Sequence, residues 1–156
     1  MCKRLLILAI TAALAGACST YHDTGYQHPE TMTQQYSQFD VVMGWDVQVA
    51  GGNTLIKGVV KNVRYLYMND LEIWVVALNP AGKVMARSVD FVIPQPLQMD
   101  ETAAFELKLP VAVTPGSKLR FTYKYRGSDG GDGPELGGAV GDTNWWQSFD
   151  FVLPAS

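Results

Sequence analysis

Apolar and polar side chains alternate over many short stretches of this chain, which is the period of a β-strand and not of a helix. The stretch SKLRFTYKYR, residues 117–126, alternates throughout. Its polar positions are Lys118, Arg120, Thr122, Lys124 and Arg126, and its apolar positions are Leu119, Phe121, Tyr123 and Tyr125. Because the apolar side must be buried, this stretch predicts a strand with one face on a core and the other in water.

Seven stretches of this kind are separated by turn-forming residues such as AGGN at 50–53 and NPAG at 79–82. They cover residues 40–49, 54–62, 70–78, 83–93, 102–109, 117–126 and 145–153. No stretch between them has the length and period of a helix. The pattern therefore predicts an all-β protein, a single immunoglobulin-like antiparallel β-sandwich of about seven strands over residues 39–156.

The stretch 70–78 differs from the others because both of its faces are apolar. Leu71, Ile73, Val75 and Ala77 fall on one face, whereas Trp74, Val76 and Leu78 fall on the other, interrupted by Glu72. In a sandwich the second face should meet water, so something must cover it: the N-terminal tether, the glycine-rich loop 127–144, or another protein. We predict Trp74, Val76, Leu78 and Trp146 as candidates for contact with a partner.

The polar face of 117–126 carries four cations, Lys118, Arg120, Lys124 and Arg126, which have two interpretations. They are candidates for binding an anionic partner such as lipid headgroups or lipopolysaccharide. Alternatively, they form a solvated outer face that is balanced by acids on neighbouring strands, the commoner arrangement in antiparallel sheets.

The N-terminal residues predict where the protein is located. Lys3 and Arg4 precede an uncharged run, residues 5–17, that is shorter than the roughly 20 residues needed to span a bilayer. It is typical of a secretory signal peptide, residues 1–17. The small residues before Cys18 resemble a bacterial lipobox, which implies cleavage before Cys18 and attachment of diacylglycerol to its thiol. Plain secretion, with Cys18 incidental, is the alternative.

After Cys18 the chain is polar and without period, so residues 18–38 are interpreted as the lipidated cysteine and a flexible tether. The residue after the cysteine is Ser19 and not Asp. By resemblance to Gram-negative lipoproteins this implies an anchor in the outer membrane, facing the periplasm, more than one in the inner membrane.

Three motifs occur in a fixed order in the domain: IKGVVKN contains Gly58, Val60 and Asn62, LEIWVVALNPAGKV contains Gly82, and PLQMDETAAFELKL contains Leu97, Glu101 and Phe105. Together they resemble the FxLYD-type immunoglobulin-like domain of bacterial envelope proteins. The resemblance spans about residues 40–126. It departs at Ala77, Asn79 and Met99–Asp100, and a WHy-type domain has a similar pattern. These motifs are structural, and the resemblance implies no catalytic residues.

Charge and histidine content exclude several function classes. Removing residues 1–17 leaves ten basic against 15 acidic residues, a net charge of −5. That argues against general nucleic-acid binding, which needs a basic surface. His22 and His28 are the two histidines and both precede the domain, so a Ser–His–Asp arrangement is excluded. We expect neither enzymatic activity nor a cofactor.

The loop SDGGDGPELGG, residues 128–138, holds Asp129, Asp132 and Glu135, which are weak candidates for a calcium site. Their spacing is neither that of an EF-hand nor that of the nonapeptide calcium repeat, and a glycine-rich loop without metal is the simpler interpretation. The sequence as a whole predicts a non-catalytic, lipid-anchored envelope protein that binds or supports another envelope component. The alternative is a lipoprotein that binds a small anionic or lipid ligand.

Overall fold

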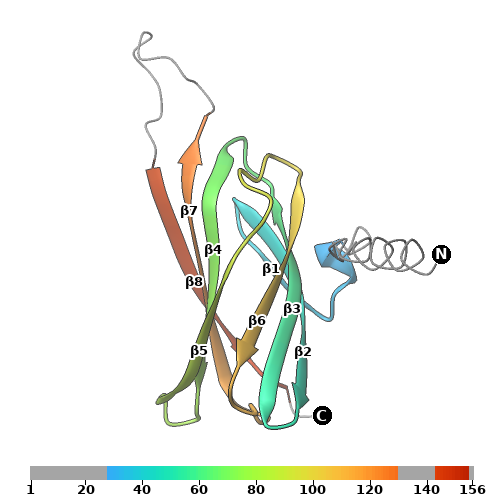
Figure 1. Cartoon of the computed structure of the whole chain (residues 1–156), viewed down its shortest axis with the longest axis vertical. Coiled ribbons are helices and arrows are strands. Elements are labelled where there is room, and N and C mark those ends of the chain that lie inside the picture. The colour runs from blue at the N-terminus through green and yellow to red at the C-terminus, as the bar shows by residue number, and fades with distance from the viewer. Residues whose placement is uncertain (1–27, 130–142, 155–156) are drawn as a thin grey trace, which may run out of the picture.

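The computed structural model describes residues 28–129 and 143–154, which form two facing antiparallel sheets of four strands (Figure 1). Sheet A has the order β1-β2-β3-β6 and sheet B the order β5-β4-β7-β8. The strands are β1 (Gln34–Ser37), β2 (Val41–Ala50), β3 (Asn53–Asn62), β4 (Tyr67–Leu78), β5 (Val84–Phe91), β6 (Thr102–Leu109), β7 (Lys118–Ser128) and β8 (Thr143–Val152).

The predicted fold class is confirmed: the chain is an immunoglobulin-like β-sandwich. Consecutive strands pair antiparallel in β1–β2, β2–β3, β4–β5 and β7–β8, whereas the chain crosses between sheets after β3, β5 and β6. The crossings place β3 beside β6 and β4 beside β7, as in a Greek key. In the part of the chain that the structure describes, no helix has the length and apolar character to cross a membrane.

The prediction of a flexible tether up to residue 38 is wrong for its last part, which contains the 3₁₀ turn η1 (Pro29–Thr31) and β1. η1 packs on Gly44, where any side chain would overlap the carbonyl oxygen of Pro29. In β1, Tyr36 stacks on Phe149 of β8 with ring centroids 3.7 Å apart. The sequence pattern did not predict β1, because the residues beside Tyr36 are polar and a strand at the edge of the sheet needs only one buried side chain.

Aromatic rings from both sheets fill the centre of the sandwich. Trp45 of β2 lies 4.9 Å from the Phe121 ring of β7, and Phe121 stacks on Phe149 at 5.2 Å. Gly58 is required by this packing, because a side chain there would overlap the ring of Phe105 on the neighbouring strand. The alternation of β7 is as predicted, with Leu119, Phe121, Tyr123 and Tyr125 all buried.

A buried carboxylate joins the two sheets. Asp40, which is 2% exposed, accepts hydrogen bonds from the Tyr123 hydroxyl at 2.7 Å and the Tyr125 hydroxyl at 2.9 Å. Burial raises the pKa of both tyrosines above the ordinary value, and the nearby Asp40 adds to the rise. Both phenols therefore stay protonated and keep donating to Asp40. This fixes the start of β2 against β7 of the opposite sheet.

The fully buried side chain of Asn62 holds the loops at one end of the sandwich. Its amide nitrogen donates to the carbonyl oxygens of Leu66, at 2.7 Å, and Leu97, at 2.9 Å. Its side-chain oxygen accepts from the Arg64 backbone N–H at 2.8 Å. One side chain thus binds the β3–β4 loop to the connection between β5 and β6.

Replacing Asn62 with alanine would remove its bonds to these three backbone groups; the Leu97 carbonyl would keep the bond from the Met68 N–H, whereas the Leu66 carbonyl and the Arg64 N–H would lose their partner. We expect Asn62→Ala to lower the free energy of unfolding by about 3 kcal/mol, because unsatisfied buried groups keep their full desolvation cost. Urea denaturation measures the loss. The matched control is Asn53→Ala, which removes an exposed amide bonded only to the Gly51 carbonyl and should cost about 0.5 kcal/mol or less. Equal losses in the two variants would contradict the role given to Asn62.

Candidate functional site

The register of sheet B brings the two predicted sets of site residues onto one surface, its outer face. The side chains of paired residues on neighbouring strands point to the same side of the sheet. The outer face therefore consists of four cross-strand rows, each of which runs from β8 across β7 and β4 to β5. The rows are Trp146–Lys124–Glu72–Phe91, Ser148–Thr122–Trp74–Val89, Asp150–Arg120–Val76–Arg87 and Val152–Lys118–Leu78–Val84. The apolar row of β4 and the cation row of β7 are therefore adjacent.

Trp74 is half-buried, and it contacts Glu72 and Lys124 of its own sheet. Its indole N–H donates to Glu72 at 2.8 Å, and the Lys124 ammonium lies 5.8 Å from the centre of its ring. Lys124 and Glu72 are themselves paired at 3.0 Å. The three side chains form one cluster in which the ring is partly shielded.

The remaining predicted contact residues differ in exposure. Val76 is half-buried, whereas Leu78 is buried, at 8% exposed, so the prediction that Leu78 forms part of an open apolar surface is wrong. Leu78 lies at the end of β4, where it is paired with Val84 of β5 and Lys118 of β7. Trp146 is 72% exposed, as a contact residue should be.

Phe91 belongs to the same surface, although the sequence did not single it out. It ends the row that Trp146 begins, and it is 59% exposed. Two large aromatic side chains thus stand at the two edges of sheet B, with the Lys124–Glu72 pair between them. Alternation along β5 predicts that Phe91 and Val89 share one face of the strand. Only the pairing of β5 with β4 places Phe91 opposite Glu72.

An open hollow of about 440 Å³ lies at the β8 side of this row. It is lined by two tryptophans, two cations and two acids together with a tyrosine and an asparagine, namely Trp145, Trp146, Lys124, Arg126, Asp70, Glu72, Tyr125 and Asn144. Its tryptophan rings are of the type enriched in protein contact surfaces, whereas small-molecule clefts are lined mostly by apolar side chains.

Each of the four candidate cations has an acidic neighbour. Lys118 and Arg120 both bind Asp150, at 3.2 and 2.7 Å. Lys124 binds Glu72, and Arg126 binds Asp70, both at 3.0 Å. The geometry fits the interpretation of a solvated face balanced by acids of neighbouring strands. The Arg120 guanidinium, with Lys118, lowers the pKa of Asp150 to about 2.

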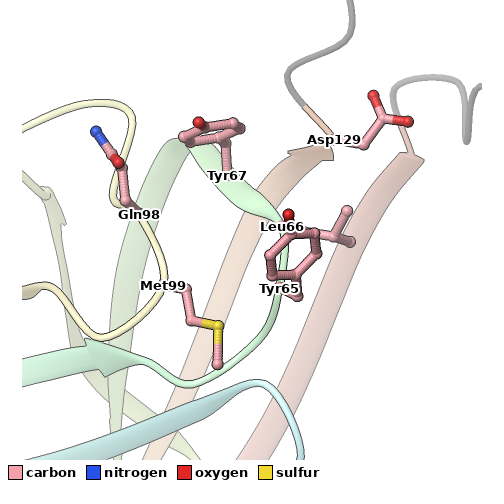
Figure 2. Close-up of a pocket in the computed structure, with 6 residues that line it drawn as sticks. All are labelled: Tyr65, Leu66, Tyr67, Gln98, Met99 and Asp129. Atoms are coloured by element: carbon pink, nitrogen blue, oxygen red, sulfur yellow. The ribbon is translucent and has the colours of Figure 1, made fainter.

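A second, smaller pocket of about 180 Å³ lies where the β3–β4 loop meets the β5–β6 connection. Figure 2 shows Tyr65, Leu66 and Tyr67 on one side and Gln98 and Met99 on the other, with Asp129 at the end of β7. Of the three calcium candidates, Asp132 and Glu135 lie outside the described residues, as does Cys18. Within the described part of the chain, no three acidic, histidine or cysteine side chains gather as metal ligands.

Comparisons with known proteins add little to this geometry. No family model matches the chain, and no curated protein matches its sequence. A solved structure that it resembles is the GAE domain of GGA2p from Saccharomyces cerevisiae, with 12% sequence identity and a TM-score of 0.49. That likeness covers 79% of this chain and 97% of the other. The function is therefore argued from the chain's own residues.

The ion pairs of Asp150 predict a pH dependence. Because the pKa of Asp150 in the folded chain is about 2, below its ordinary 3.8, its contribution to stability is complete above pH 4 and is lost as the pH falls toward 2. We expect Asp150→Asn to lower the free energy of unfolding at pH 7 by less than about 1 kcal/mol, since the pair is largely exposed and screened.

Urea denaturation of the wild type and Asp150→Asn across this pH range measures the difference. The two curves should converge at low pH, and the difference at pH 7 should shrink in high salt. A difference that stays constant down to pH 2 would exclude the assigned ion pairs as its cause.

Proposed function

We propose that this chain is a non-catalytic, lipid-anchored protein of the cell envelope that binds another envelope protein through the outer face of sheet B. Cys18 carries the anchor, and the sandwich presents the face on the periplasmic side of the outer membrane. Trp146, Phe91 and Trp74 supply the apolar contacts. The surrounding ion pairs supply the polar rim of the contact.

The observation that carries this proposal is the row Trp146–Lys124–Glu72–Phe91. Isolated exposed apolar residues are ordinary on a protein surface, but here two aromatic side chains, 72% and 59% exposed, lie in one cross-strand row. Trp74 lies in the adjacent row. Tryptophan and tyrosine, with arginine, dominate the energetics of protein interfaces, and paired charges commonly surround them.

Binding of a small anionic or lipid ligand is the second candidate, and the ion pairs weigh against it. An anion on Lys118, Arg120, Lys124 or Arg126 would have to compete with Asp150, Glu72 or Asp70 for each of them. A protein partner needs no such exchange, because it can bury the rings and leave the pairs in place.

Trp146→Ala tests the face. Since the side chain is exposed, the variant should lose about 0.5 kcal/mol of stability or less, while recovery of the partner from solubilised envelopes should collapse. Mass spectrometry of proteins that co-purify with the full chain measures the recovery, and urea denaturation measures the stability.

The matched control is Tyr65→Ala, which truncates an aromatic side chain that is 86% exposed but lies at the small pocket, away from the face. It should leave recovery unchanged. If Tyr65→Ala removes the partner and Trp146→Ala does not, the contact lies at the loop end and the proposed face is wrong.

Cys18→Ser tests the anchor separately. The variant lacks the proposed acylation site, so the chain should move from the membrane fraction to the soluble periplasmic fraction, because two or more acyl chains are what hold such a protein stably. Fractionation after a salt wash, followed by immunoblotting, measures the shift. Cys2→Ser is the control and should remain with the membrane. Retention of Cys18→Ser on membranes would contradict lipid anchoring.

A further inference from the structure

Strand β8 is the last strand of sheet B, and its outer edge is long and regular. Its register with β7 runs without interruption from Lys118↔Val152 to Gly127↔Thr143, so it contains no bulge. It has no proline, and Asp150 is its one charged residue. Figure 1 shows β8 at the side of the sandwich, beyond β7. In the described residues no strand pairs with that edge.

The hydrogen bonds of Leu153 show which backbone N–H and carbonyl groups of β8 face β7 and which face outward. The Leu153 N–H donates to the Ser117 carbonyl at 2.9 Å, and the Leu153 carbonyl accepts from the Gly116 N–H at 3.0 Å. Both groups of Leu153 thus face the β7 side. Because direction alternates along an antiparallel strand, Phe151 and Phe149 also face β7, whereas the N–H and carbonyl groups of Trp146, Ser148 and Asp150 face outward.

The other sheet edges are short or closed. β1 has only four residues. The edges β5 and β6 lie beside each other, and the Asp90 carboxylate of β5 accepts the Glu106 backbone N–H of β6 at 2.7 Å. Glu106 pairs with Lys108 of β6 and with Lys57 of the neighbouring β3, so β6 carries charged side chains along that edge. Natural sheets use such devices against edge-to-edge pairing, and β8 has none of them apart from the single charge of Asp150.

We propose that β8 pairs antiparallel with β8 of a second copy of this chain, centred on Ser148. In this register residues 144–152 of the two copies face each other throughout. The outward backbone groups of Trp146, Ser148 and Asp150 in each copy then complete a ladder between the copies. The two sheets B become one continuous eight-stranded sheet.

The side chains of β8 are compatible with a copy of themselves. With Ser148 at the centre, Asp150 of one copy faces Trp146 of the other, so like charges are not opposed. On the inner side Trp145, which is half-buried, faces Phe151 of the second copy, which is half-buried as well. Cross-strand aromatic pairs of this kind stabilise antiparallel sheets, and the pairing would cover ring surface that the single copy leaves open.

Pairing of β8 leaves the outer face of sheet B free. It joins the two outer faces side by side, with Trp146 of each copy close to the two-fold axis. The dimer therefore presents one wide surface in place of two narrow ones. The pairing does not depend on the proposed partner, since it uses the strand edge and not the face.

Ser148→Pro tests the pairing in the full chain, kept in detergent. The substitution removes an outward N–H and places a ring on the edge, but it costs no backbone hydrogen bond to β7, only the hydroxyl contact with Thr122 that Ser148→Ala loses as well. Sedimentation equilibrium should give twice the monomer mass for the wild type and the monomer mass for Ser148→Pro. Ser148→Ala, which loses the hydroxyl contact with Thr122 but keeps the N–H, should remain a dimer.

Gln147→Lys is a second variant in case proline disturbs the strand. Gln147 is exposed, so the fold should tolerate lysine, but in the pair each lysine would lie at the joined edge and repel the other copy. This variant should also be a monomer. A wild-type chain that is monomeric at every concentration would overturn the proposal, and so would a dimer that persists in both Ser148→Pro and Gln147→Lys.

Discussion

The buried amide of Asn62 is the constraint on which one end of the sandwich depends. β3 leaves sheet A at this residue, and the chain must cross to sheet B without leaving backbone groups unpaired in the interior. The side chain of Asn62 binds the loop that makes the crossing and also the connection that returns from β5 to β6. The start of β4 and the connection that follows β5 meet at that junction, and these two strands carry Trp74 and Phe91.

Strand β7 links the core to the outer face. Its inner side chains, Tyr123 and Tyr125, bind Asp40 of the opposite sheet, and Phe121 packs against Trp45. Its outer side chains pair with acids on β4 and β8. Because the inner side is fixed by buried hydrogen bonds and ring packing, the outer cations are held in register with their acids, and the aromatic residues around them keep their spacing.

A four-stranded face with paired charges and exposed rings suits a contact surface that is formed before the partner arrives. The Lys124–Glu72–Trp74 cluster restricts all three side chains, so less conformational entropy remains to be lost on binding. The edge strand β8 borders the same surface through Trp146. A partner on the face and a second copy at the edge can therefore be accommodated together.

The sequence by itself determined the fold class, the alternation of β7 and most strand positions, because those depend on local side-chain period and on turn residues such as Asn79 and Gly82. It also marked Trp74 and Trp146 as unusual. Only the tertiary structure revealed β1, whose polar residues gave no signal, and placed Phe91 in one row with Trp146. Likewise, only strand pairing brought Asp150, Glu72 and Asp70 to the cations of β7. These features depend on which strands are neighbours and in what register, and long-range pairing leaves no trace in the local pattern of a single chain.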